Sequence, residues 1–254
     1  MTTTTDAFLT PTPEDVAYPI KLDVQRLIVD YSDSRPRNLQ TDLGPSEIGH
    51  PCDRKLAQLV MREPGFDRRT GDVLPSFVGV GGHSMMEEAL RHYNATHGAR
   101  YLIEHRIEIR PNLYGHLDCY DAETRTVLDW KFPGNSRMAV YRKYGPSQQY
   151  RVQAHTYGYG LKLQGIPVDR VGIMFLPRGG RLVDAHFWLE DYDEQVALDA
   201  IARQDAIAIM VDTFDVENHP ENYAFFNREP DECVFCPFHN PKPTTPYECA
   251  GGLA

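Results

Sequence analysis

The chain has 254 residues, of which 41% are hydrophobic and 24% are charged, as is ordinary for a globular domain. No run of eighteen apolar residues occurs, and the N-terminus lacks the basic and apolar segments of a secretory signal. We therefore expect a cytoplasmic protein without a membrane span. Five cysteines in that compartment favour metal or cluster ligation over disulfides.

The net charge of −10 argues at first against a nucleic-acid partner, but the charge is unevenly distributed. Residues 190–232 hold thirteen acidic residues and two arginines, which leaves 24 basic against 23 acidic residues elsewhere. Between Lys131 and Arg151 there are five basic residues, three interleaved tyrosines and no acid. Such a stretch suits a single nucleic-acid strand, whose phosphates are held by charge and whose bases stack on rings. A solvated loop explains the composition equally well.

In chain order, a threonine- and proline-rich flexible arm is expected over residues 1–19, followed by a single domain over 20–254. Apolar spacing predicts helices at 22–31, 46–60, 83–96, 147–163 and 193–212. Alternating segments predict strands at 101–109, 114–121, 126–132, 168–176 and 181–189. Helices thus alternate with strands in a way that predicts a mixed central β-sheet flanked by helices, the α/β class.

The second and third predicted strands carry the residues that best indicate chemistry. Residues 122–125 join them as a hairpin, and side chains along a strand alternate faces, so Asp129 and Lys131 share one face and Asp118 lies on the neighbouring strand. Two carboxylates, with the Trp130 carbonyl as a third oxygen, suit Mg²⁺ or Mn²⁺, and Lys131 could stabilise charge on a phosphate. The alternative is an ordinary hairpin with a cross-strand salt bridge.

Two further features fit this site. His83 follows the glycine-rich run 79–82 at the predicted start of a helix, from which it could reach the sheet and complete a metal shell. Gln149, Gln153 and Tyr157 are four residues apart on one helix and form a polar stripe. That stripe either faces solvent or binds phosphate and the lysine.

Four cysteines form a second constellation. Cys233 and Cys236 are a CxxC pair, Cys249 follows thirteen residues later, and Cys52 lies far upstream. Four thiolates from these positions match either a 4Fe–4S cluster or a structural zinc, and unligated thiols are the third possibility. His239 is an alternative to Cys249 as the fourth ligand. Cys119, on the strand of Asp118, is expected to be a small buried residue.

Taken together, Gly115-x-x-Asp118, Asp129-x-Lys131 and Gln153-x-x-x-Tyr157, preceded by His83, resemble the PD-(D/E)XK nuclease superfamily and its RecB-like branch. The resemblance implies a restriction-endonuclease-like core. It also implies that His83, Asp118 and Asp129 bind the divalent metal, that Lys131 is catalytic, and that Gln153 and Tyr157 support the site and the DNA. Asp129 stands where the branch more often has glutamate.

One cysteine before these motifs and three after them resemble the iron–sulfur staple of AddB-type helicase–nucleases and of CRISPR-associated exonucleases of the Cas-four type. By this resemblance Cys52, Cys233, Cys236 and Cys249 hold a 4Fe–4S cluster that joins the N- and C-terminal segments. It implies a stand-alone, phage-encoded DNA exonuclease in the host cytoplasm, acting 5′ to 3′ on single-stranded ends, with DNA and possible recombination or CRISPR-type proteins as partners. Gln149, Arg137, Arg142 and Lys143 are the further expected DNA contacts.

Two alternatives remain beside this hypothesis. One is a non-catalytic DNA-end-binding module of the same fold, and the other is the same nuclease with zinc in place of the cluster. Neither strand preference, polarity, pathway nor oligomeric state can be read from the residues themselves.

Overall fold

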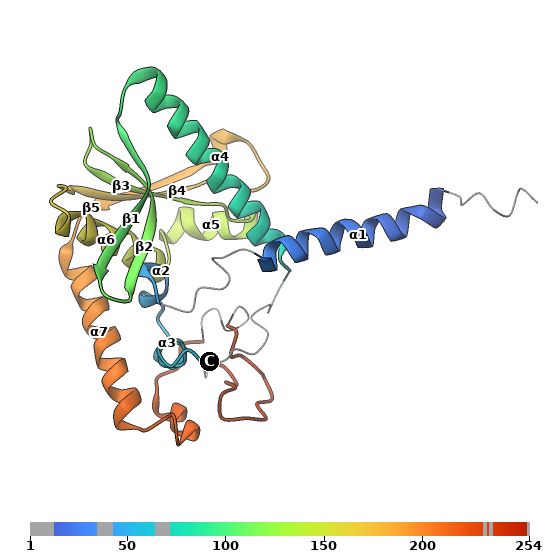
Figure 1. Ribbon diagram of the computed structural model, residues 1–254, viewed down its shortest axis with the longest axis vertical. Coiled ribbons are helices and arrows are strands. Elements are labelled where there is room, and N and C mark those ends of the chain that lie inside the picture. The colour runs from blue at the N-terminus through green and yellow to red at the C-terminus, as the bar shows by residue number, and fades with distance from the viewer. Residues whose placement is uncertain (1–12, 35–42, 64–71, 231–232, 234–235, 253–254) are drawn as a thin grey trace, which may run out of the picture. The chain divides into compact units, whose positions relative to one another are not determined.

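The structure is a computed structural model that describes residues 13–34, 43–63, 72–230, 233 and 236–252 (Figure 1). The chain divides into two compact units, residues 1–40 with 72–77 and residues 41–71 with 78–254. The expected single domain over 20–254 stays a prediction, and the first helix with the segment 72–77 forms a compact unit by itself. The part of the predicted arm over residues 1–12 lies outside the described residues.

The smaller unit is built around helix α1, Pro13–Ser34. The helix includes residues 13–19, which the sequence assigned to the N-terminal arm. Pro13 stands at the first helical position, where its missing N–H would have no partner, whereas Pro19 lies inside the helix. Tyr31 of α1 packs edge-to-face on Phe77, with ring centroids 6.2 Å apart. Phe77 belongs to the first turns of α4, Leu74–His97, whose remainder is part of the larger unit.

The larger unit contains a five-stranded mixed sheet in the order β1-β2-β3-β4-β5. The strands are β1 Tyr101–Arg110, β2 Leu113–Asp121, β3 Thr126–Lys131, β4 Arg170–Phe175 and β5 His186–Asp191. Only β3 and β4 pair in parallel, and helices α5 (Asn135–Tyr144) and α6 (Gln148–Leu163) form the connection between them. The predicted α/β class, a mixed sheet flanked by helices, is confirmed.

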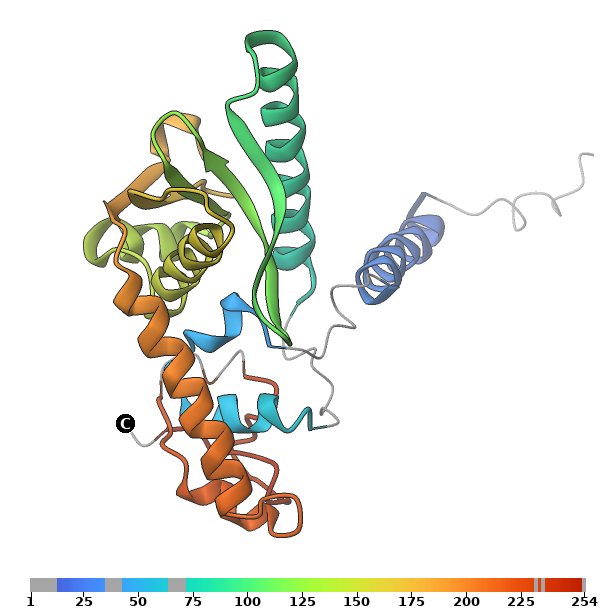
Figure 2. The ribbon, with the colours of Figure 1, turned by 60° about the vertical axis from the view of Figure 1, so that its left-hand side comes forward.

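Helices cover both faces of this sheet (Figure 2). Leu90 of α4 packs with Cys119 and Trp130 on one face. On the other face Ala154 and Leu161 of α6 pack on a cluster whose sheet members are Ile107, Leu117, Tyr120, Val127 and Val171. The strands β2 and β3 are therefore apolar on both sides, as central strands between two helical layers must be.

Local sequence chemistry accounts for the differences from the predicted helices. The expected helix 46–60 is two helices, α2 Pro45–Ile48 and α3 Asp53–Val60, because Pro51 cannot continue a helix and disfavours helical backbone at the residue before it. Cys52 is the N-cap of α3. Helix α5 lies in the stretch that was read only as basic, since it has just two buried residues, Met138 and Tyr141, to mark its inner face.

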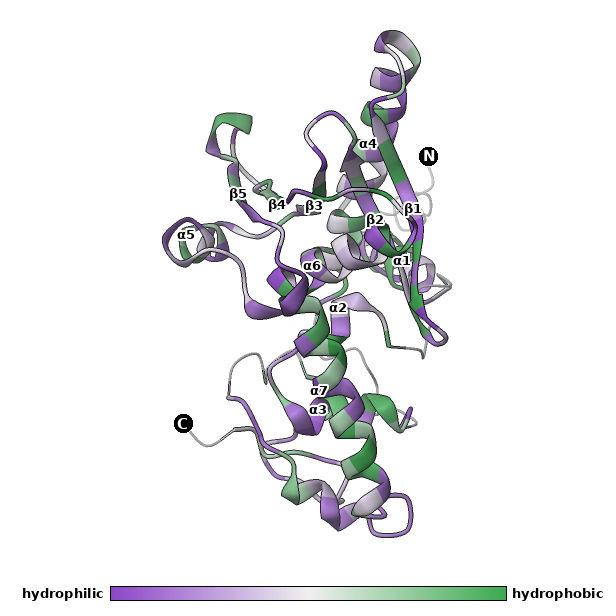
Figure 3. Cartoon of the chain, turned by 90° about the vertical axis from the view of Figure 1, so that its left-hand side faces the viewer, coloured by the Kyte–Doolittle hydropathy of each residue, from purple (hydrophilic) through white to green (hydrophobic). Residues whose placement is uncertain are grey.

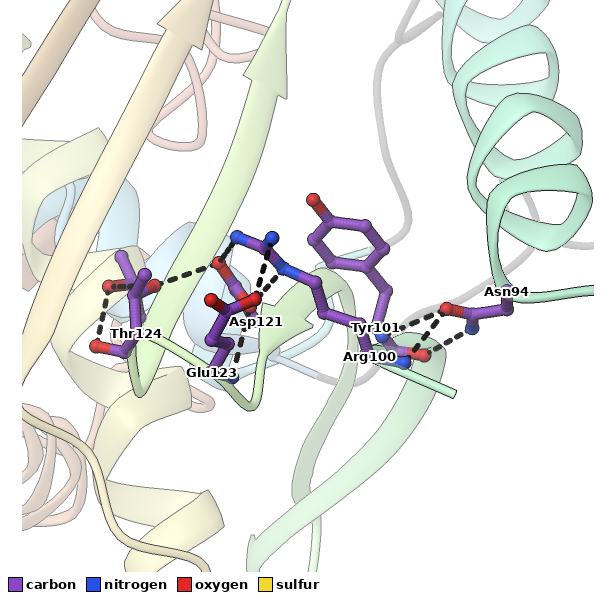
Figure 4. A network of polar contacts seen from close by, with 7 residues as sticks. Asn94, Arg100, Tyr101, Asp121, Glu123 and Thr124 are labelled. Carbon is purple, nitrogen blue, oxygen red and sulfur yellow. Dashed lines mark hydrogen bonds and ion pairs between the residues drawn. The ribbon is translucent and has the colours of Figure 1, made fainter. Parts of the chain in front are cut away.

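The glycine run 79–82 is not a turn but part of α4, so His83 lies inside that helix rather than at its start. The C-terminal end of α4 is tied to the sheet by a polar network (Figure 4). The Asn94 side-chain oxygen accepts from the backbone N–H groups of Arg100 and Tyr101, at 3.1 and 3.0 Å. The guanidinium of Arg100 then binds both carboxylate oxygens of Asp121, at 2.8 and 2.7 Å. This network fixes how α4 lies along β1 and β2.

A second core lies below the sheet, between α3 and α7, Glu194–Thr213 (Figure 3). Leu56 of α3 and Ile207 and Val211 of α7 pack there on Tyr223 and Phe226, which belong to the short 3₁₀ helix η3 (Pro220–Phe225) and the residue after it. Another short 3₁₀ helix, η2 Leu182–Asp184, precedes β5. None of the described helices has the length and apolar character needed to cross a bilayer.

Candidate functional site

The site is built where β2 and β3 separate. Their ladder runs from Asp121↔Thr126 to Cys119↔Leu128 and stops there. Beyond that point the Trp130 N–H donates to Asp118 Oδ2, at 2.8 Å, so the carboxylate replaces a ladder bond between the two strands. Because the N–H and C=O of one residue point to the same neighbouring strand, the Trp130 carbonyl faces this same gap.

A strained residue in β1 lies opposite Asp118. Glu104 has φ of +47°, and it stands between the paired positions Ile103↔Cys119 and His105↔Leu117. Residues two apart on a strand normally share a face, but Leu117 packs on the α6 face and Cys119 on the α4 face. The alternation of side chains in β2 is therefore interrupted at Asp118. Backbone strain of this kind is concentrated at functional sites. Burial raises the pKa of Cys119 to about 12, in keeping with a buried small residue.

Asp129 and Lys131 lie on the face of β3 that α6 covers. Lys131 Nζ is 2.6 Å from Asp129 Oδ2 and donates to Gln153 Oε1 at 3.3 Å. The same ammonium lies 4.6 Å from the centre of the Tyr150 ring. Three groups on two elements thus hold the lysine in one place.

His83 reaches the site from α4, and its Nδ1 is 3.2 Å from Asp118 Oδ1. Its ring packs edge-on against Phe132, with centroids 5.4 Å apart. The approach depends on Gly82, since a Cβ there would lie 2.5 to 2.7 Å from three carbons of the Phe132 ring. The structure therefore brings together the four residues that the sequence proposed as a unit: His83, Asp118, Asp129 and Lys131.

The two carboxylates differ in their electrostatics. Burial raises the pKa of Asp129 to about 6, in spite of the adjacent Lys131. Burial also acts to raise the pKa of Asp118, but the hydrogen bond to His83, the charge of Lys131 and the Trp130 amide outweigh it, so that this pKa lies below its ordinary value. A second cation would favour the charged form of both acids.

The donor set fits a hard divalent ion. Asp129 Oδ2 is buried and makes no hydrogen bond of ordinary geometry, although Lys131 Nζ is close to it. Carboxylate oxygens with an imidazole suit Mg²⁺ or Mn²⁺. Among the described residues no three histidine, cysteine or acidic side chains already surround a single point as metal ligands, because Asp118 and Asp129 are turned toward His83 and Lys131.

The polar stripe of α6 is not a solvent-facing surface. Gln153 and Tyr157 are 6% and 4% exposed, and the Tyr157 ring lies against Gly115, where a Cβ would be 3.0 Å from its hydroxyl. Gln149 donates to the Ser46 carbonyl and so attaches α6 to α2. Only Gln153 of the three has a contact with the lysine among the interactions described.

The predicted DNA-contacting cations lie on α5. Arg137, Arg142 and Lys143 are exposed, while Met138 and Tyr141 of the same helix pack on β4. Arg142 donates to the Asp184 carbonyl, and Lys143 Nζ lies 4.7 Å from the Tyr144 ring centre. Arg151, also in the basic stretch, is paired with Glu190 at 2.6 Å.

Sequence reasoning missed three residues of the site. Tyr150 was noted only as an interleaved aromatic, whereas its ring faces Lys131. Gly82 and Phe132 allow α4 to approach β3. A glycine directly before the candidate histidine was the one available signal, because glycine inside a helix often marks close packing.

The four predicted cysteine ligands line one cavity. Its wall also includes His50, Arg54, Lys55, Gln58, Arg228, Glu229, His239, Gly251 and Gly252. Cys52 comes from the start of α3 and the other three from the C-terminal segment, so the cavity lies between regions far apart in sequence. All five cysteines are free thiols.

Three residues of the cavity wall have polar atoms without partners. His50 Nε2, Arg54 Nε and Gln58 Oε1 are buried and make no hydrogen bond within the described part of the chain. Only two other side-chain atoms described share this property, Asp129 Oδ2 and the Tyr192 hydroxyl. Four of the five atoms therefore lie at the two places where the sequence expects a metal. A cluster fits this donor set, since each thiolate of a cubane binds a different iron and need not meet the others at one point.

The sequence matches no protein-family model and no curated protein. Solved structures with a similar course of the chain include an alkaline exonuclease from Laribacter hongkongensis, at 12% identity and a TM-score of 0.46 over 73% of this chain and 94% of that one. Its complex with dAMP gives 14% and 0.48 over the same shares. A phage-related exonuclease from Haemophilus somnus 129PT gives 14% and 0.37, over 61% and 77%. Similarities this low establish neither family nor function.

Proposed function

We propose that this chain is a divalent-metal-dependent exonuclease that hydrolyses phosphodiester bonds at single-stranded DNA ends. The observation that supports it is the convergence of Asp118, Asp129 and Lys131 at the point where β2 and β3 part. A purely structural salt bridge would not need a second carboxylate and an imidazole beside it.

The groups that would hold Mg²⁺ or Mn²⁺ are His83, Asp118, Asp129 and the Trp130 carbonyl. Such an ion, when bound, supplies an activated water and neutralises charge on the phosphate. Lys131 donates to the phosphate or to the attacking water, and a fixed cation is worth most where charge develops. Gln153 and Tyr150 position that ammonium, since one accepts from it and the other offers a ring face.

The DNA backbone would run over the exposed side of α5. This helix begins four residues after Lys131 and presents Arg137, Arg142 and Lys143 while its other side is buried. Charge attraction of this kind is independent of sequence and falls with salt. A 5′ to 3′ direction, a phage origin with action in the host cytoplasm, and protein partners in recombination or CRISPR-type pathways follow from the family resemblance alone.

For the cysteine cavity we propose a 4Fe–4S cluster held by Cys52, Cys233, Cys236 and Cys249. It would fasten the segment before α3 to the C-terminal segment, and cluster loss should loosen both. Zinc is the second candidate, and it is favoured by one observation: His239 lines the same cavity and pairs through its backbone with Cys249. Visible absorption with iron, acid-labile sulfide and zinc analysis decides between them.

The nuclease proposal is tested by digestion of DNA labelled at the 5′ or 3′ end, single- or double-stranded, linear or circular. We expect cleavage of linear single strands with Mn²⁺ or Mg²⁺ and none with a chelator. Asp129→Asn and Lys131→Ala should lower the rate by about 10²-fold or more.

The matched control is Lys162→Ala, since this lysine pairs with Glu194 on the exposed side of α6, away from the site. Folding of all variants is checked by circular dichroism. Full activity of Lys131→Ala would refute the role of the lysine. DNA binding by the wild-type protein without cleavage under any metal condition would identify a binding module instead.

A further inference from the structure

The cavity lined by the four cysteines holds a histidine whose hydrogen bonding is half satisfied. His50 is 3% exposed, and it stands two residues before Cys52. The Cys52 N–H donates to His50 Nδ1 at 3.1 Å, so Nδ1 is an acceptor and carries no proton. In a neutral imidazole the proton is then on Nε2. Nε2 is therefore a donor, and it is buried without a partner among the residues described.

The position of this ring is firmly set by its surroundings. Arg203 of α7 donates to the His50 carbonyl and to the Pro51 carbonyl, both at 2.8 Å, and it forms an ion pair with Asp53. The imidazole is thus held in one place and in one tautomer beside the cysteine.

Arg54 offers a second donor of the same kind. One terminal nitrogen of its guanidinium donates to the Pro246 and Glu248 carbonyls, at 2.8 Å each, and so anchors the segment that leads into Cys249. The Nε–H on the same rigid plane remains without a described partner and is buried in the cavity wall. A buried donor without an acceptor is destabilising, and both donors belong to residues that line one cavity, which points to an acceptor bound there.

The charge of the cavity wall indicates what kind of acceptor this is. Arg54, Lys55 and Arg228 are cations, and Glu229 is the one acid among the described lining residues. Four thiolates and the sulfides of a cluster are weak, anionic acceptors. Cations and N–H donors around them stabilise the state with more electrons.

We propose that His50 Nε2–H and Arg54 Nε–H donate hydrogen bonds to the sulfur atoms of the cysteine-bound cluster and thereby raise its reduction potential. This inference rests on the proposed 4Fe–4S cluster and goes beyond it, because it assigns tuning residues that are not ligands. His50 is in this sense a positioning residue: it holds the Cys52 backbone through Nδ1 and contacts the cluster sulfur through Nε2.

Two substitutions at His50 separate these two roles. In His50→Asn the side-chain oxygen stands near the place of Nδ1 and can still accept from the Cys52 N–H, but the distal donor is lost. In His50→Gln the side-chain N–H₂ stands near the place of Nε2 and keeps the donor, while the acceptor is lost. The pair therefore distinguishes a hydrogen bond to sulfur from support of the loop.

The measurement is the midpoint potential of the anaerobically purified full-length protein, followed by visible absorption in a redox titration. Iron and sulfide are counted in each sample. We expect His50→Asn to shift to a more negative potential and His50→Gln to stay near wild type; a tenfold change in the equilibrium is ~59 mV for one electron. Loss of iron from His50→Asn, while His50→Gln retains it, also supports the donor role.

Equal potentials in all three proteins, or equal changes in both variants, overturn the inference while leaving the cluster in place. Wild-type protein that holds zinc, or that holds no iron and sulfide after reconstitution, overturns the cluster and this inference together. Neither result bears on the nuclease site, whose test is chelator-sensitive cleavage.

Discussion

Replacing Gly82 with alanine tests how α4 delivers His83 to the site. A Cβ at this position would lie 2.5 Å from the nearest carbon of the Phe132 ring, far inside normal contact. Either the Phe132 ring or helix α4 must move. Both movements would displace His83, because its ring packs edge-on against Phe132 and its backbone is part of α4. A Cβ at the neighbouring Gly81 would have no atom within 4 Å, so Gly81→Ala is a matched control.

The magnitude follows from two opposing effects. Alanine inside a helix stabilises the folded state by about 1 kcal/mol relative to glycine, and both substitutions have this favourable effect. Overpacking costs about 1–3 kcal/mol, and only Gly82→Ala carries that cost. The two variants should therefore differ by about 1–3 kcal/mol, with Gly81→Ala more stable than wild type. For a chain of this size each kcal/mol is about 2–4 °C in Tm.

Thermal denaturation gives the stability, and cleavage of end-labelled single-stranded DNA with Mn²⁺ gives the activity. Displacing a metal ligand by about 1 Å can lower the rate about 10²-fold, so Gly82→Ala should lose activity while Gly81→Ala retains it. Adding Phe132→Leu to Gly82→Ala should restore part of the stability by making space. Equal stability and equal activity of the two glycine variants would refute this account of the packing.

Three further substitutions probe other parts of the fold. Burial acts to raise the pKa of Asp121, but hydrogen bonds from Arg100 outweigh it and hold this pKa below the ordinary 3.8. The Arg100–Asp121 pair therefore stabilises the fold at pH values above 3.8, and this stabilisation is lost as the pH falls through the pKa of Asp121 in the folded protein. Asp121→Asn should cost about 1–3 kcal/mol at neutral pH and flatten the acid limb of Tm against pH; an unchanged limb would contradict this. Gly160→Ala should cost about 1–3 kcal/mol or more in urea denaturation, because its Cβ would fall 1.9 Å from Ile107 Cγ2. Arg203→Ala should lower the iron content per protein, because the backbone before Cys52 loses its hydrogen bonds; full occupancy would argue against that role.

Much of the sheet could be predicted from the sequence because strand alternation and turn chemistry are local. The hairpin of β2 and β3 and the α/β class are confirmed. The helix predicted to begin at 147 does so with Ser147 as its N-cap, whose side chain accepts from the Tyr150 N–H. Helix α5 and the break at Pro51 were harder to predict from the sequence. The first has a short apolar stripe, and the second divides a stretch whose apolar spacing continues on both sides.

The chemistry of the site could be read from residue types, but its geometry could not. Spacing alone put Asp129 and Lys131 on one face of a strand, and that relation holds at 2.6 Å. The role of Gly82, the ring of Tyr150 beside the lysine and the burial of Gln153 depend on which helix packs on which face. Those contacts join residues that are distant in sequence, and no local pattern encodes them.

The sequence by itself determined the order of the elements, the alternation that pairs an acid with a lysine, and the presence of four cysteines in two distant groups. Only the tertiary structure decided that His83 meets Asp118 and that all four thiols line one cavity together with unpartnered donors. The physical reason is that periodicity and turn preferences act over a few residues. Close packing and polar satisfaction, in contrast, are conditions on the whole folded chain.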